Sequence, residues 1–448
     1  MVSADAKPRE QWSSRLGFTL AAVGSAVGLG NMWRFPYQTS EAGGAAFVLL
    51  YLVMTALIGV PIMLAELTVG RGAGKSPIQA LRHFGGRGWG ALGFVFIAAG
   101  AIILGYYSVV AGWTARYAVE IAAFGPPQDP AGHFGALAFG NGALAWHLAF
   151  MALTAVIVAQ GIKGGIERAS LVLMPVLAFL VSGLAIYAST LDGAMAGYAY
   201  YLNVDVRKVV DLGTLAKAAG QAFFSLSLGM GAILTYASYL SRDDNLPAQA
   251  LIISLADFGI AFLAGLLVFP LLFAFDLQGE ATGGLGTLFI TLPRAFQTLG
   301  VLGRVLGCLF FVALAVGALT STISLLEVVV SSGVDALGWP RRRVAWSAAL
   351  LIALVGTPAA YSGAYLDFMD AVAGNLLLVI GGLLLAVLVG WVMKDPEGEV
   401  RAGAPRASWV FAWRGILRFV VPAILVLVLY DAFGEVRDKA AALLGGGG

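Results

Sequence analysis

The sequence predicts an all-α polytopic membrane protein, and three features carry the prediction. Apolar residues make up 59% of the 448 residues and charged residues only 12%, whereas soluble globular proteins have about 25% charged residues. Apolar stretches of about 20 residues, the length at which a helix crosses a bilayer, recur along the whole chain. The chain also contains 59 glycines, far above the usual share of about 7%. This composition excludes a soluble multidomain enzyme.

Eleven apolar stretches predict about 11 transmembrane helices. Most of the 27 Lys and Arg residues fall in the loops that this count places on the cytoplasmic side, as the positive-inside rule requires. We therefore expect a multi-pass protein of the cell inner (plasma) membrane, with a cytoplasmic N-terminal segment over 1–14 and the C-terminus outside. The stretches lie near 15–39, 45–70, 90–122, 142–159, 167–190, 213–240, 247–277, 300–332, 343–362, 366–393 and 410–433.

Glycine runs interrupt the first and the sixth stretch. Residues 24–31 read GSAVGLGN and residues 225–231 read SLSLGMG. A single pair of small residues in a span usually serves close helix packing, which is the alternative interpretation. Two such runs with Asn or Ser, five stretches apart, instead favour discontinuous helices whose unwound backbone lines a cavity.

Several function classes are disfavoured by the composition. The net charge of +2 does not indicate the basic surface that nucleic-acid-binding proteins have. The single cysteine, Cys308, and three histidines leave little for a disulfide framework or a transition-metal site. Neither a catalytic cluster nor a selectivity-filter loop is visible, so we expect neither an enzyme nor a channel. The expected partners are a small-molecule substrate and the lipid bilayer, and the oligomeric state stays open between monomer and homodimer.

Five motifs give the chain a resemblance to a known family. They are WSSRLG at 12–17, VGLGNMWRFP at 27–36, KGGIER at 163–168, QAFFSLSLG at 221–229 and LTS at 319–321. With these motifs the chain resembles the neurotransmitter:sodium symporters, in their bacterial amino-acid transporter branch. The resemblance implies two inverted five-helix repeats over 15–190 (helices 1–5) and 213–393 (helices 6–10), unwound helices 1 and 6, and an additional helix 11 over 410–433.

The resemblance also implies a function. We expect a sodium-coupled secondary active symporter that imports a hydrophobic L-amino acid, including large or aromatic ones, by alternating access. Amine-transporting relatives carry an aspartate at the position of Gly28, so a glycine there favours a substrate that brings its own carboxylate. Transport of a betaine, an amine or a small carboxylate is the alternative. The residues implied in substrate binding are Ala26, Leu29, Gly30, Ile103, Tyr107, Phe224, Ser225, Ser227, Met230, Ser321, Ser324 and Leu325.

Two Na⁺ sites follow from the same resemblance. One would use Gly24, Val27, Gly317, Thr320 and Ser321, and the other would use Ala26, Asn31, Ser225 and Asp257. Asp257 stands where better-known relatives have an asparagine, so we expect its carboxylate to take the place of chloride and to remove any chloride requirement. An ordinary structural acid is the alternative for Asp257. The hydroxyls alone could equally bond back to their own helices.

Charged residues within and beside the spans imply two gates. Arg34 would pair with Asp370 at the outer mouth, and Tyr107 and Phe224 would close the lid above the substrate. The inner gate would contain Arg9, Asp335, Trp12, Tyr239 and Glu327. The alternative is that Arg9 and Asp335 are only membrane-edge charges.

Two further features of the spans are interpreted more plainly. Gly165 and Pro175 bracket a candidate hinge in the fifth span, for which a static kink is the alternative. Glu66 in the second span is assigned only a structural role.

Overall fold

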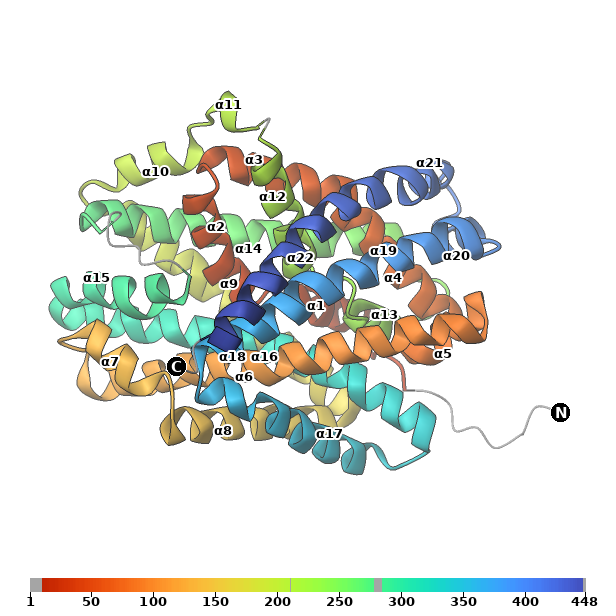
Figure 1. Ribbon diagram of the computed structural model, residues 1–448, viewed down its shortest axis with the longest axis horizontal. Helices are drawn as coiled ribbons and strands as arrows, with labels where there is room; N and C mark the ends of the chain where they lie inside the picture. Colours follow the sequence, from red (N-terminus) through yellow and green to blue (C-terminus); the bar gives the residue numbers. More distant parts are fainter. Residues whose placement is uncertain (1–9, 210, 278–283, 446–448) are drawn as a thin grey trace.

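The computed structural model describes residues 10–209, 211–277 and 284–445, and within these ranges it contains helices and no strands (Figure 1). Nine helical segments of the described chain are long and apolar enough to cross a membrane, and one bent pair makes a tenth. The nine segments cover Ala45–Ala73, Arg87–Phe124, Asn141–Ala159, Ile162–Ser189, Leu246–Ala274, Gly300–Leu337, Arg341–Ala360, Gly363–Val392 and Val410–Leu444. The all-helical membrane fold predicted from the sequence is confirmed.

The bent pair is the first predicted span. Helix α1 (Arg15–Ala26) is capped by Ser14, whose side chain accepts a hydrogen bond from the backbone N–H of Gly17. After α1 the backbone becomes extended at Val27. The chain then resumes as the π-helix η1 (Gly30–Arg34) and α2 (Phe35–Glu41), bent by 47° from α1.

The sixth predicted span is divided between α12 (Leu212–Ser225) and α13 (Ala232–Ala237). A 14-residue helix is about 21 Å long, which is too short to cross the roughly 30 Å hydrocarbon core alone. The turn between them places Ser227 at φ 54°, Gly229 at 78° and Gly231 at 74°. Glycine adopts such angles without strain, which explains two of the three positions.

The remaining helices surround these two breaks. The longest, α6 (Gly90–Phe124) and α16 (Gly300–Leu337), pack against each other through the middle of the bundle. Several spans contain π-helical turns: η2 (Thr55–Gly59) joins α3 (Ala45–Met54) to α4 (Val60–Ala73), η4 (Ile162–Glu167) precedes α9 (Arg168–Ser189), and η8 (Asp370–Leu377) and η9 (Leu388–Val392) flank α19 (Leu378–Val387).

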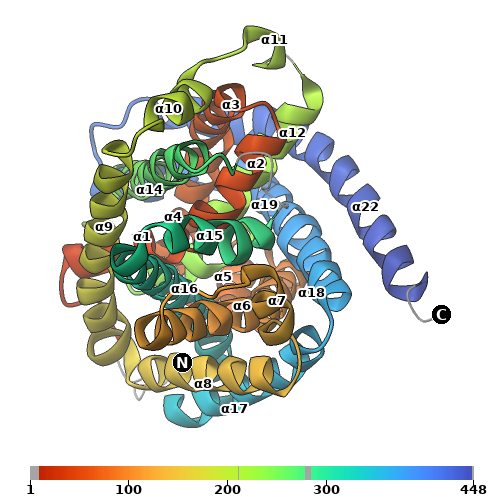
Figure 2. The ribbon, with the colours of Figure 1, turned by 90° about the vertical axis from the view of Figure 1, so that its left-hand side faces the viewer.

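Further spans and connecting helices complete the described chain. The spans are α8 (Asn141–Ala159), α14 (Leu246–Ala274), α17 (Arg341–Gly356), α18 (Gly363–Met369), α21 (Val410–Gly415), η10 (Ile416–Val420) and α22 (Val421–Gly445). The connections are α5 (Pro77–Gly85), α7 (Pro130–Leu137), α10 (Ala194–Leu202), α11 (Val206–Val209), η6 (Thr287–Thr291), α15 (Leu292–Thr298) and α20 (Pro396–Gly403). Two short 3₁₀ helices, η3 (Arg87–Trp89) and η7 (Thr357–Ala360), form the ends of spans. Figure 2 shows α22 at the edge of the bundle, where it packs against α12, α18, η8 and α19.

Candidate functional site

The two helix breaks enclose a small cavity of about 30 Å³. Its walls come from α1, η1, α6, α12, the turn after α12, and α16, which are the elements that the sequence predicts at the substrate site. Ten of the twelve residues expected to bind substrate line it, together with Gly28. The lining residues are Ala26, Gly28, Gly30, Ile103, Tyr107, Phe224, Ser225, Ser227, Met230, Ser321 and Leu325.

The two expected residues outside this lining lie directly behind it. Leu29 is fully buried, and its backbone N–H donates to the Tyr107 hydroxyl at 2.8 Å. The Ser324 hydroxyl donates to the carbonyl of Ser321 at 2.9 Å and accepts from Ser25. Both residues therefore support the wall of the cavity.

Gly28 is the position where the cavity leaves no room for a side chain. A Cβ built there would lie 2.4 Å from the Ser321 Oγ and 2.8 Å from the Tyr107 hydroxyl oxygen. Real Cβ atoms do not approach other heavy atoms this closely. The glycine thus allows the hydroxyls of Tyr107 and Ser321 to face the break in the first span.

Asp257 on α14 is the centre of a buried polar cluster beside the cavity. Its carboxylate accepts hydrogen bonds from the Asn31 amide at 2.6 Å, from the Ser225 hydroxyl at 2.9 Å and from the Tyr51 hydroxyl at 2.9 Å. Asp257 and Asn31 are fully buried. Carboxylate, amide and hydroxyl oxygens suit a hard cation, and the structure brings together Asn31, Ser225 and Asp257, three of the four residues predicted for one sodium site. Ala26, the fourth, lines the neighbouring cavity with Ser225.

The backbone at the first break offers carbonyl oxygens to the other predicted sodium site. In a continuous helix the N–H of Gly28 would bond Gly24 and that of Asn31 would bond Val27. Here the Gly28 N–H donates to the Asn31 side chain at 2.9 Å, and the Asn31 N–H donates to the carbonyl of Gly28 at 3.2 Å. The carbonyls of Gly24 and Val27 are thereby released from the helical pattern, as the other predicted sodium site requires.

The α16 part of that site packs closely on the break. A Cβ built at Gly317 would lie 3.6 Å from the Cα of Gly28. The hydroxyls of Thr320 and Ser321 donate to the Gly317 carbonyl at 2.9 and 3.3 Å. These hydroxyls therefore bond back to their own helix in this structure, and their oxygen lone pairs still remain as acceptors.

A larger vestibule of about 660 Å³ lies on one side of the small cavity. Phe224 lines both spaces and separates them. The Arg34 guanidinium lies over the Phe224 ring, 4.5 Å from its centroid. Helix α22 forms part of the vestibule wall with Val428, Asp431, Ala432, Glu435 and Lys439.

The expected ion pair between Arg34 and Asp370 is not among the ion pairs of the described residues. Arg34 instead donates to the side-chain oxygen of Asn375 at 2.6 Å. Asp370 accepts a hydrogen bond from the Tyr106 hydroxyl at 2.6 Å. The structure therefore differs from the sequence expectation, because each group binds a different neighbour, although both line the vestibule.

The opposite side of the cavity is closed by the chain that enters α1. The Trp12 indole donates to the carbonyl of Tyr236 at 3.0 Å and meets that ring edge-on. Ser13 and Ser14 donate to the carboxylate of Glu167 at the end of η4. These contacts fasten the start of the first span to the fifth and sixth spans.

The predicted inner gate is only partly within the described residues. Arg9 lies outside them, so its expected pairing with Asp335 is not described. Asp335 accepts the backbone N–H of Ser76 at 2.9 Å. Tyr239 donates to the buried Glu327 at 2.7 Å, and Arg341 pairs with the same carboxylate.

The candidate hinge between Gly165 and Pro175 lies in ordered helix. Gly165 belongs to the π-helix η4, and Pro175 lies inside the continuous α9. A Cβ built at Gly165 would lie 1.9 Å from the Ile157 carbonyl oxygen, so close contact with the preceding span explains this glycine.

The comparisons with known proteins agree with this geometry. The model of the sodium:neurotransmitter symporter family matches residues 9–125 and 138–440. The chain belongs to the sodium:neurotransmitter symporter family. It is 35% identical to a sodium-dependent transporter of Bacillus subtilis, over 95% of this chain and 98% of that protein. It is 31% identical to the human sodium-dependent neutral amino acid transporter SLC6A17, over 60% of this chain and 41% of that protein. The crystal structure of MhsT in complex with L-phenylalanine superposes with a TM-score of 0.87 at 39% identity, covering 95% of this chain and all of MhsT.

As a sodium:neurotransmitter symporter, the protein is a multi-span, sodium-dependent membrane transporter and no enzyme. Sequence reasoning missed several polar residues of this symporter. Arg341 was treated only as one of the basic residues that set the orientation, although a buried Glu327 needs a cationic partner. Asn375 and Glu435 carried no motif signal.

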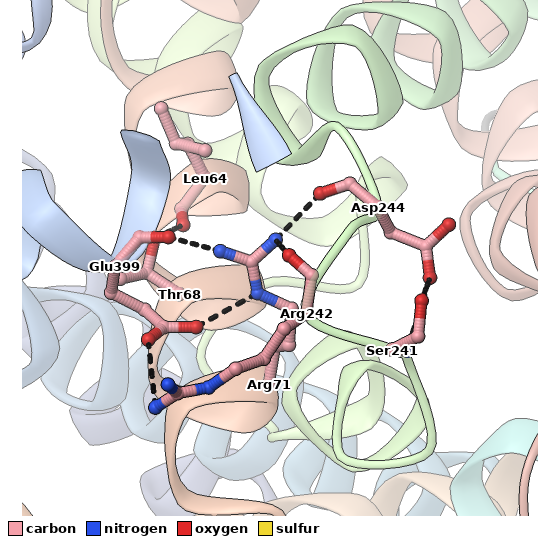
Figure 3. A network of polar contacts seen from close by, with 7 residues as sticks. All are labelled: Leu64, Thr68, Arg71, Ser241, Arg242, Asp244 and Glu399. Atoms are coloured by element: carbon pink, nitrogen blue, oxygen red, sulfur yellow. Dashed lines mark hydrogen bonds and ion pairs between the residues drawn. The ribbon is translucent and has the colours of Figure 1, made fainter. Parts of the chain in front are cut away.

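Arg71 at the end of α4 was missed in the same way, and Figure 3 shows the polar contacts that it makes. Its side chain is buried, and it donates to the Glu399 carboxylate at 2.8 Å and to the carbonyls of Arg242 and Asp244. The Asp244 carboxylate in turn pairs with Arg15, the first residue of α1, at 3.1 Å. In this symporter Arg71 therefore ties α20 and the loop before α14 to α4.

Proposed function

We propose that the protein imports a hydrophobic L-amino acid together with Na⁺ through the inner (plasma) membrane, with the vestibule facing outward. The observation that carries this proposal is the cavity at Gly28. Tyr107 and the unwound backbone provide hydrogen-bond donors for a carboxylate, and the N-terminal ends of helices attract negative charge. Among the described residues no acidic side chain lines the cavity, so a bare amine would find no partner there.

The remaining walls of the cavity support a hydrophobic side chain on the substrate. Ile103, Phe224, Met230 and Leu325 line it and are buried. Methionine is flexible and adapts to side chains of different shape. The neighbouring MhsT was crystallised with L-phenylalanine, and SLC6A17 is named a neutral amino acid transporter, which supports the same substrate class here.

Sodium would bind at the two oxygen-rich groups described above, one around Asp257 and one around Thr320. Only the group around Asp257 contains a carboxylate. A fixed negative charge beside a sodium ion does the work that a bound chloride would otherwise do, so we propose that transport needs no chloride.

Alternating access follows from the two sides of the cavity. With sodium and substrate bound, Phe224 and an Arg34–Asp370 ion pair close the vestibule side. Release on the other side requires Trp12 to leave Tyr236. Arg9, Asp335, Tyr239 and Glu327 would hold that side shut until then. Since only one side opens at a time, the sodium gradient drives uptake.

The test is a binding screen of the twenty L-amino acids on purified protein, by thermal stabilisation in sodium and in potassium. We expect stabilisation by apolar amino acids in sodium only. If no amino acid stabilises the protein in a sodium-dependent way, the proposal is refuted. Uptake into liposomes with chloride replaced by gluconate tests the chloride claim, and a requirement for chloride would overturn it.

A further inference from the structure

Two residues without an assigned role connect Arg34 to the C-terminal helix. Arg34 donates to the side-chain oxygen of Asn375 at 2.6 Å. The amide nitrogen of Asn375 donates to the Glu435 carboxylate on α22 at 2.8 Å. Both the oxygen and the nitrogen of the Asn375 amide are therefore hydrogen-bonded, and the bond to Glu435 fixes the orientation of the amide.

The π-helix η8 places two acceptors for Arg34 side by side. Asp370 and Asn375 are five residues apart, and the i→i+5 hydrogen bonds of a π-helix put such residues one turn above each other. The Asp370 carboxylate is turned toward Tyr106 and lies against Gly374, where a Cβ would be 2.5 Å from its oxygen. Arg34 can thus bind one acceptor or the other with a small change of side-chain direction.

The two acceptors are unequal. A guanidinium binds a carboxylate more strongly than a neutral amide, because the carboxylate carries a full negative charge and can accept two parallel hydrogen bonds from the guanidinium. Without further help, Arg34 would favour Asp370. The contact from Glu435 offsets this preference in two ways, since it orients the oxygen of Asn375 toward Arg34 and adds a negative charge behind it.

Contacts with neighbouring helices fix the position of α22. Lys439, one turn after Glu435, donates to Asp367 on α18 at 2.7 Å. Helix α22 also packs directly against η8. Glu435 is therefore presented to Asn375 from a helix that is fixed at the rim of the vestibule.

We propose that Glu435, through Asn375, is a positioning residue that holds Arg34 away from Asp370 and keeps the vestibule open before substrate binds. The proposal rests on the proposed function only in that the Arg34–Asp370 pair closes the vestibule. It gives α22, which lies outside the two predicted repeats, a direct part in the gate.

Thiol labelling inside the vestibule tests the proposal. In a Cys308→Ser background, Gly220→Cys places the reporter on the vestibule wall, where the nearest atom to a built Cβ is 3.9 Å away. A neutral, water-soluble maleimide avoids any effect of Glu435 on the reagent itself. Purified protein is labelled in sodium without amino acid, and the rate of labelling measures how open the vestibule is.

We expect Glu435→Ala and Asn375→Ala to slow labelling about 3- to 10-fold, because Arg34 moves to Asp370. Glu435→Gln still accepts the hydrogen bond from Asn375 but lacks the negative charge, so it should label at a rate between those of the parent and Glu435→Ala. Asp438→Ala is the matched control, since Asp438 lies on the same helix and its side chain is exposed. Adding Asp370→Asn should cancel the effect of Glu435→Ala, which a purely structural role would not explain.

Unchanged or faster labelling of Glu435→Ala and Asn375→Ala would overturn the proposal, as would persistence of the effect in the Asp370→Asn background. Monodisperse elution and unchanged sodium-dependent thermal stability establish that each variant folds. If Glu435→Ala fails to fold, Asn375→Ala alone decides the outcome. The labelling experiment uses no amino acid, so a failure of the proposed substrate class and a failure of the proposed role of Glu435 give separate results.

Discussion

Replacing Gly28 with alanine tests the carboxylate pocket. The added methyl group would lie 2.8 Å from the Tyr107 hydroxyl oxygen and 2.4 Å from the Ser321 Oγ. Both hydroxyls must then turn away, in a cavity of only about 30 Å³. The substrate would lose at least one hydrogen bond to its charged group, which is worth about 1.5–3 kcal/mol. This corresponds to a loss of affinity of about 10- to 150-fold.

The assay is sodium-dependent binding of a radiolabelled amino acid to purified protein. Tyr107→Phe should weaken binding to a similar extent, and the double variant should be little weaker than either single one, because both changes remove the same hydrogen bond. Gly183→Ala on the exposed face of α9 is the control, since no atom of the described residues lies within 4 Å of a Cβ there. Parent-like affinity of Gly28→Ala, or full additivity with Tyr107→Phe, would refute the reasoning.

Three other changes give separate readouts. Asp257→Asn should reduce sodium-dependent uptake at least about tenfold, because the buried carboxylate beside the sodium site is lost, and added chloride should partly restore it; uptake that stays at the parent level and indifferent to chloride would contradict this. Glu66→Gln should lower the free energy of unfolding by about 1–3 kcal/mol. Glu66 accepts hydrogen bonds from the backbone of both Gly229 and Leu234, and the amide nitrogen of glutamine cannot accept one. Thermal melting checks this prediction, with Glu41→Gln at an exposed position as the control that should melt like the parent. Arg341→Ala leaves Glu327 buried without its cation, a change that commonly costs about 3–5 kcal/mol, whereas Arg342→Ala should melt like the parent, and equal melting temperatures would argue against the ion pair.

Much of the fold could be predicted because membrane spans are long and apolar. The predicted stretches match the bent first span and eight of the nine other spans to within about five residues, and both breaks fall at the glycine runs. The last span was predicted too short, since it continues to Leu444 and not 433. The π-helical turns were not foreseen. Their i→i+5 register depends on packing against neighbouring helices, and residues such as 370–377 have no composition that distinguishes them from an α-helix.

The residues that line the cavity could be predicted better than the partners of the charged residues. Glycine, asparagine and short hydroxyls at the breaks carry a signal of their own, so ten expected residues meet at one cavity. The choice of partner for a charge carries no such signal. Arg34 binds Asn375 instead of Asp370, and Glu327 binds Arg341, because partners are selected by distances between elements remote in sequence. Whether these residues contact sodium or substrate stays a prediction.

Glu66 gives the sixth span a property that its broken helix would not suggest. Its carboxylate binds one backbone N–H in the turn and another at the start of α13. Discontinuity therefore does not mean flexibility here: the turn is fastened from the side by α4. A rocking motion that moves α13 should therefore move α4 as well, and we expect the second and sixth spans to move together as one rigid unit.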